Sequence, residues 1–183
     1  MITLKTEVWK HFYLKDICQI TMGNKLDYSD MTSDNPKISF VGRTGENNGI
    51  VGKVDYMAGI SPCKAGCMTV ALGGSLGATF LHETDFYTSQ NVAVLEFEEG
   101  VSIYAKLFLS LLIMNECKYK YFSFGRELNA HIKKDFVVRL PIKYNSDGTP
   151  YIDDAKQYNE NGYIPDWQFM DDYIKSLPYA DLI

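Results

Sequence analysis

The chain has 183 residues, of which 46% are hydrophobic, 14% aromatic and 22% charged. This composition is typical of a single folded domain and excludes disordered, collagen-like and low-complexity chains. The longest strongly apolar stretch, residues 103–114, is interrupted by Lys106 and Ser110 and is too short to cross a bilayer. The N-terminus also lacks the apolar run of a secretory signal, so we expect a cytoplasmic protein without membrane contact.

The formal net charge of −5 argues at first against a polyanionic partner. The charge is unevenly distributed, however. Residues 145–183 contain two basic and eight acidic residues, whereas residues 118–143 contain seven basic and two acidic ones. The second stretch carries a local charge of +5 and could therefore face phosphate groups.

The first thirty residues show no clear periodicity. Five later segments are rich in β-branched and aromatic residues and are bounded by turn residues, which predicts strands. Their ranges are 37–43, 49–57, 67–72, 78–84 and 91–97. Residues 47–49 (NNG) and 73–77 (GGSLG) can adopt positive φ and predict tight reversals between these strands.

Residues 103–117 are apolar nearly all round and predict a buried helix. Residues 136–142 predict another strand, and residues 143–164 a long loop that ends the domain. Asp166 is placed to cap a short amphipathic helix that stops at Pro178. We therefore expect an α+β fold, in which a central twisted, mostly antiparallel sheet with hairpins packs with one buried helix and the C-terminal helix. The expected division is a domain over 1–164 and a helix over 165–183.

No pattern in the sequence predicts catalysis or a bound cofactor. The segment 73–77 lacks the Gly-Lys-Ser/Thr ending of a phosphate-binding loop, and Asp172 and Lys175 have the wrong spacing for a nuclease centre. Only Cys63 and Cys67 form a close cysteine pair, and the three histidines stand far apart. We expect no catalytic residue, no metal and no cofactor, and reduced cysteines that are mostly buried.

The basic stretch is the first candidate for binding. Within residues 118–126 cations alternate with aromatic side chains, which suits phosphate contacts and stacking but is equally typical of a half-buried strand or helix end. The candidate phosphate-binding residues are Lys118, Lys120, Arg126, Lys133 and Lys134.

A second candidate group lies at the predicted turn around residue 47. It consists of Arg43, Thr44, Asn47 and Asn48. Arginine and asparagine are the side chains that pair in two-pronged fashion with guanine and adenine edges in the major groove. Asparagines are also ordinary turn residues, and this reading of Asn47 and Asn48 stays open.

The order of several short motifs resembles a known family. The motifs are NNGIVG at 47–52, G-x2-TVA-x-GGS-x-G at 66–77, F-x2-S-x-NV-x2-L at 86–95, R-x2-N at 126–129, Leu140-Pro141, and PDW-x2-M-x2-YIKSL at 165–177. Together they resemble the target recognition domain of type I restriction-modification DNA specificity subunits, especially in BcgI-like systems and fused methyltransferase-endonucleases. The resemblance covers residues 9–177.

The resemblance implies a non-catalytic domain that reads one half of a bipartite double-stranded DNA target. It also implies partners, namely an adenine-N6 DNA methyltransferase subunit and a restriction subunit. Specificity subunits usually carry two recognition domains separated by long helices, whereas this chain carries one and ends just past the start of the first long helix. A second copy of the chain is therefore a further expected partner.

Two other readings remain at this stage. The chain could be a remnant or half-subunit that binds a methyltransferase or a second specificity copy without reading DNA, or an enzyme of unrecognised type. The C-terminal helix bears on the first of these, because its side chains either pack on their own domain or dock a partner. The candidate interface residues are Trp167, Met170, Asp171, Asp172 and Tyr173.

Overall fold

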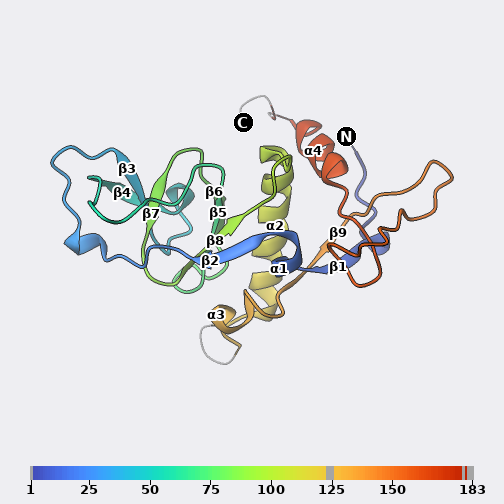
Figure 1. Cartoon of the computed structure of the whole chain (residues 1–183), viewed down its shortest axis with the longest axis horizontal. Coiled ribbons are helices and arrows are strands. Elements are labelled where there is room, and N and C mark those ends of the chain that lie inside the picture. The colour runs from blue at the N-terminus through green and yellow to red at the C-terminus, as the bar shows by residue number, and fades with distance from the viewer. Residues whose placement is uncertain (1, 123–125, 179, 181–183) are drawn as a thin grey trace.

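The computed structural model describes residues 2–122, 126–178 and 180 (Figure 1). The strands are β1 (Lys10–Tyr13), β2 (Gln19–Met22), β3 (Ile38–Val41), β4 (Ile50–Val54), β5 (Met68–Ala71), β6 (Thr79–Leu81), β7 (Phe86–Thr88), β8 (Val92–Glu96) and β9 (Val137–Leu140). The α-helices are α1 (Leu14–Ile17), α2 (Ile103–Lys120), α3 (Leu128–His131) and α4 (Trp167–Lys175). Short 3-10 turns are η1 (Thr6–Val8), η2 (Tyr28–Asp30) and η3 (Asn47–Gly49).

The expected α+β class is confirmed, and the strands are distributed over three sheets. The four-stranded sheet has the order β2-β8-β5-β6 and is antiparallel throughout. A three-stranded sheet of order β4-β3-β7 combines an antiparallel hairpin with one parallel pair, β3 and β7. Strands β1 and β9 form a separate antiparallel pair. Each predicted strand is present, in a shorter form.

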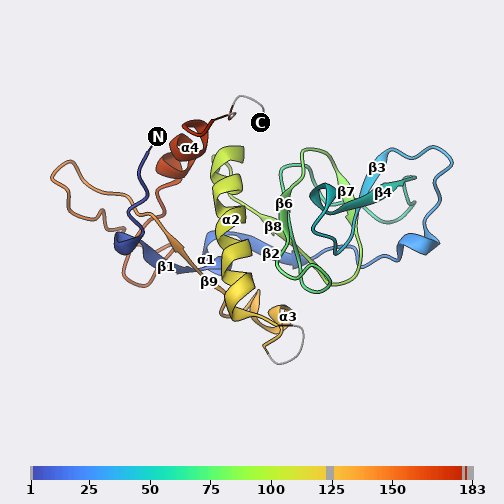
Figure 2. The ribbon, with the colours of Figure 1, turned by 180° about the vertical axis from the view of Figure 1, so that it is seen from behind.

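Helix α2 runs through the middle of the molecule, next to the four-stranded sheet (Figures 1 and 2). Its N-cap is Ser102, whose Oγ accepts a hydrogen bond from the backbone N–H of Ala105 at 3.1 Å. Phe108, Leu109 and Ile113 are buried in the main core. Leu111 on the opposite side is 55% exposed, so the helix is covered on one face and open on the other.

Helix α4 packs on α2, and its predicted start is confirmed. Asp166 caps it, since its Oδ1 accepts a hydrogen bond from the backbone N–H of Phe169 at 3.0 Å. Met170 and Ile174 are buried in the main core. The long loop before α4 is also held against the domain, because the Tyr158 hydroxyl donates to Glu98 Oε2 at 2.9 Å, and burial together with this carboxylate raises the pKa of Tyr158 to about 12.

The cysteines are free thiols, as the sequence predicts. Cys18, Cys67 and Cys117 are buried, and Cys63 is half-buried. Burial raises the pKa of Cys117 to about 12 and that of Cys63 to about 11, so both thiols stay protonated at neutral pH.

Candidate nucleic-acid interface

Two loops leave the three-stranded sheet at the same end of its strands. Strands β3 and β7 run parallel, with Val41 opposite Thr88, so the segments that follow them start side by side. These segments are residues 42–49 and 89–91. The backbone N–H of Ser89 donates to the carbonyl oxygen of Val41 at 2.8 Å and ties the two exits together.

Two further segments join them from the four-stranded sheet. In the register of that sheet, Ala71 at the end of β5 lies opposite Val92 at the start of β8, and Met22 at the end of β2 lies opposite Ala93. Residues 72–78 and 23–28 therefore emerge beside residues 89–91. We call the four segments 23–28, 42–49, 72–78 and 89–91 the loop face.

The glycine-rich loop 72–78 supports the loop that carries Arg43. The backbone N–H of Ser75 donates to the carbonyl oxygen of Arg43 at 3.0 Å. Gly74 has φ +66°, and a Cβ atom there would lie 2.6 Å from the same oxygen. The predicted reversal at 73–77 is thus present, and its glycine allows two backbones to approach closely.

The same loop joins the loop face to the C-terminal end of α2. Gly77 has φ +82°, and a Cβ atom there would overlap with the Cβ atom of Cys117. Lys118 and Lys120 follow Cys117 on the last turn of the helix. The loop 72–78 therefore connects the two groups of residues that the sequence analysis singled out.

All five candidate phosphate-binding side chains are exposed. The Nζ of Lys118 lies 5.4 Å from the ring centroid of Tyr119, and Lys120 pairs with Glu116. The Arg126 guanidinium lies 5.0 Å from the ring centroid of Tyr121. Tyr121 is buried in the core and Tyr119 is 65% exposed, so one ring of this stretch packs inside the domain and the other lies on the surface. Residues 123–125 of the basic stretch lie outside the described residues.

Lys133 and Lys134 follow α3 directly after its C-cap residue, Ile132. Helix α3 lies beside the loop face, since Asn129 lines a hollow together with Leu72 and Asn91. Figures 1 and 2 show α3 at the C-terminal end of α2, on the side of the molecule where the loops of the four-stranded sheet turn.

The structure divides the four candidate base-reading residues between two surfaces. Arg43 and Thr44 line a hollow on the loop face together with Tyr28, Gly74 and Gln90. The side chain of Arg43 is exposed at its rim. These two residues are therefore available to a ligand that covers the loop face.

Asn47 and Asn48 form the turn of the β3–β4 hairpin, with φ values of 48° and 52°. The Nδ2 of Asn47 donates to the carbonyl oxygen of Ile50 at 3.0 Å, which uses part of its side chain within the turn. Asn48 lines a different groove, between β6 and the open face of α2, together with Phe80 and Leu107. The positive φ values of Asn47 and Asn48 are those expected of ordinary turn residues. Base contact by these two residues stays a prediction.

Three polar residues of this region were not found from the sequence. Lys25, Gln90 and Asn129 border the hollow beside α3, and all three are exposed. Gln90 occupies the variable position of the F-x2-S-x-NV motif at 86–95, and Asn129 is the last residue of the R-x2-N motif. These two motifs could therefore have drawn attention to Gln90 and Asn129, although neither motif predicts which surface its residues line.

Four of the five candidate interface residues on α4 are buried or pack on other elements of their own chain. Met170 is fully buried and Asp171 is 7% exposed. The rings of Trp167 and Tyr173 pack on Phe97 and Phe108, at centroid distances of 6.4 and 5.4 Å. Asp172 is exposed and accepts a hydrogen bond from Gln168 Nε2 at 2.9 Å, so a partner contact at this residue stays a prediction.

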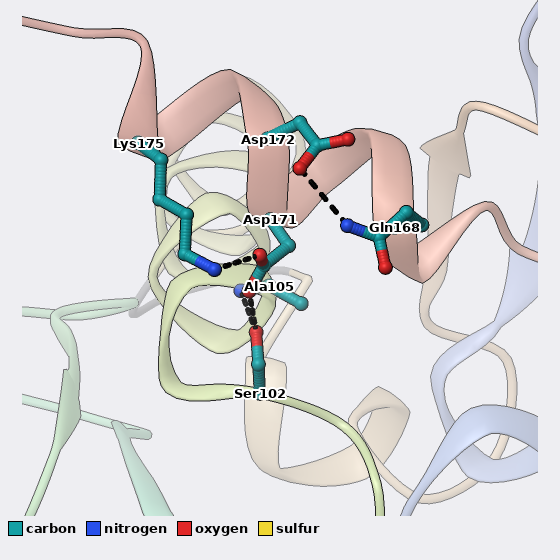
Figure 3. A network of polar contacts seen from close by, with 6 residues as sticks. All are labelled: Ser102, Ala105, Gln168, Asp171, Asp172 and Lys175. Atoms are coloured by element: carbon teal, nitrogen blue, oxygen red, sulfur yellow. Dashed lines mark hydrogen bonds and ion pairs between the residues drawn. The ribbon is translucent and has the colours of Figure 1, made fainter.

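The acidic pair on α4 has divided roles (Figure 3). Asp171 accepts a hydrogen bond from the Ser102 hydroxyl and pairs with Lys175 at 2.5 Å. Burial opposes ionisation of Asp171, but the bonds from Lys175 and Ser102 outweigh burial and lower the pKa of this carboxyl. Asp171 thus joins α4 to the start of α2 in its ionised form.

Within the described residues, no three side chains of His, Cys, Asp or Glu gather as a metal site would require. Of the helices described, none combines the length and the apolar character needed to cross a membrane.

An α+β scaffold that gathers four polar loops beside exposed cations has the architecture of a recognition module. Residues 6–149 match the family model of the type I restriction modification DNA specificity domain. The chain belongs to this family, and the resemblance noted from its motifs is confirmed. A comparison with curated proteins finds no match.

Solved structures show the same fold. The S subunit of a type I restriction-modification system from M. genitalium superposes with a TM-score of 0.55 at 15% identity, over 72% of this chain and 34% of that one. The HsdS subunit from Thermoanaerobacter tengcongensis gives a TM-score of 0.51 at 13% identity, over 77% of this chain and 34% of that one. A third structure, described for complex assembly and conformational transition of the type I R-M system, gives a TM-score of 0.56 at 13% identity, over 77% of this chain and 35% of that one. The chain thus spans about a third of these proteins.

Proposed function

We propose that this domain is the non-catalytic, sequence-specific double-stranded DNA-binding module of a restriction-modification system. The observation that carries the proposal is the continuity of the loop face. Arg43 rests on the glycine-rich loop 72–78, and this loop abuts the end of α2 from which the exposed lysines follow. One surface can thus present a base-reading side chain and phosphate-binding cations to the same duplex.

The partners extend this proposal. A methyltransferase that modifies adenine at N6 would be directed to the target by the DNA-bound domain, and a restriction subunit would join the complex, in the cytoplasm. Asp172 on the outer side of α4 is the proposed partner contact. A second copy of the chain would supply the other half of a bipartite target.

Arg43→Ala is the variant that tests base reading. The proposal predicts that the variant loses about 1–3 kcal/mol of binding free energy at one base-pair position and keeps its non-specific affinity. The measurement is selection from a pool of random duplexes, followed by titration of the selected sequence and of one unrelated sequence.

Lys53→Ala is the matched control, because Lys53 is exposed at the far end of the same hairpin, opposite Ser39. It should return the consensus of the unmodified chain. An unchanged consensus for Arg43→Ala would mean that Arg43 is only a loop residue. Absence of duplex binding by the unmodified chain would favour the reading in which it binds protein partners without DNA.

A further inference from the structure

Gln90 stands at the tip of the shortest connection on the loop face. Residues 89–91 join β7 to β8, and Asn91 completes the reversal with φ +56°. Both flanks of Gln90 are bonded to neighbouring strands. The backbone N–H of Ser89 donates to Val41, and the carbonyl oxygen of Asn91 accepts from the backbone N–H of Leu72 at 2.9 Å. The backbone that carries Gln90 is therefore fixed before any ligand arrives.

The side chain of Gln90 lies between the two hollows of the loop face. It borders the hollow that contains Arg43 and Thr44, and also the hollow that contains Lys25 and Asn129. Gln90 thus lines both hollows. A duplex laid across the loop face would meet it between the two neighbouring cations.

The chemistry of Gln90 suits a base edge better than a phosphate. Its side chain is exposed, and its amide offers both a donor and an acceptor. Asp27 lies in the same hollow as Arg43, and its carboxylate is already bonded locally. Its Oδ1 accepts hydrogen bonds from the backbone N–H of Ser29 at 3.0 Å and from the Ser29 hydroxyl at 2.8 Å. A glutamine amide matches the N6 donor and N7 acceptor that adenine presents in the major groove.

We propose that Gln90 is a specificity-determining residue that reads an adenine of the target in the major groove, next to the base pair read by Arg43. This inference rests on the proposed DNA-binding function. It adds the base and the side chain that recognises it. The backbone on both sides of Gln90 is held by hydrogen bonds, so the loop cannot shift to reach a base whose edge lies elsewhere. This rigidity makes the contact selective for one base.

The test uses the full chain and a pool of random duplexes. We expect the unmodified chain to select a consensus that contains an adenine, and Gln90→Ala to lose the preference at that position alone. Titration of the consensus duplex should show an affinity about five- to a hundredfold lower for the variant, with unchanged affinity for unrelated duplexes. Gln19→Ala is the control, because Gln19 is exposed at the opposite end of β2.

A duplex with 7-deazaadenine at that position removes the N7 acceptor and identifies the contact. It should weaken binding by the unmodified chain and leave binding by Gln90→Ala unaffected. An unchanged consensus for Gln90→Ala, or loss of preference at a G·C pair, would overturn the assignment while leaving the proposed function in place. Lack of any consensus for the unmodified chain would overturn both.

Discussion

Replacing Lys118, Lys120, Arg126, Lys133 and Lys134 together by alanine is expected to lower the affinity for every duplex by about five hundred- to thirty thousandfold near 0.1 M salt. Each cation that neutralises a phosphate releases condensed counterions and contributes about 0.9 to the slope of log affinity against log salt. Three to five contacts therefore account for this range. The slope itself should become less steep by about 3 to 4.5.

The matched control removes five exposed lysines elsewhere. They are Lys5, Lys15, Lys37, Lys53 and Lys143. The change in net charge is identical in the two variants, so a general electrostatic effect would lower both affinities alike. A salt slope that is the same in the two variants would remove the phosphate-binding role from residues 118–134.

Gly77→Ala is expected to destabilise the domain far more than Gly59→Ala, although both glycines have φ +82°. A left-handed conformation costs an alanine about 1–2 kcal/mol at either position. At Gly59 a Cβ atom meets nothing within 4 Å, whereas at Gly77 it overlaps with Cys117 on α2. Overpacking of this kind adds about 1–3 kcal/mol.

Urea denaturation of the two variants measures this difference as a difference in the free energy of unfolding. We expect Gly77→Ala to lie about 1–3 kcal/mol below Gly59→Ala, and to bind DNA more weakly in a folded population, because the loop must move away from α2. Equal unfolding free energies would show that the loop 72–78 does not depend on its contact with α2.

The elements predicted correctly are those whose signals are local. Asp166 caps its helix as predicted, and the predicted turns have positive φ at Asn47, Asn48, Gly49, Gly74 and Gly77. Strands β1, β2 and β7 were not predicted, because the first thirty residues show no clear periodicity and β7 is only three residues long. The parallel pairing of β3 with β7 depends on contacts between segments almost fifty residues apart, which no local pattern encodes.

The candidate site was predictable in part for the same reason. Charge in the sequence located the exposed cations around α3, and side-chain type singled out Arg43. Asn48 lines a different groove from Arg43, because the direction of a side chain in a left-handed turn is set by the folded backbone. Gln90 reaches the same surface only through the register of two sheets, and Met170 lies in the core because α4 folds back on α2.

Photo-crosslinking tests the central claim, that the loop face is the surface that binds DNA. A photoreactive amino acid would be placed in turn at Ser75, Gln90 and Lys133 on or beside the loop face, and at Asp147, Asp154 and Asp172 in the acidic C-terminal part, all of them exposed positions. With a duplex selected by the unmodified chain, the account predicts crosslinks to DNA from the first three positions and none from the last three. Crosslinks from the acidic positions, or equal yields from all six, would contradict it.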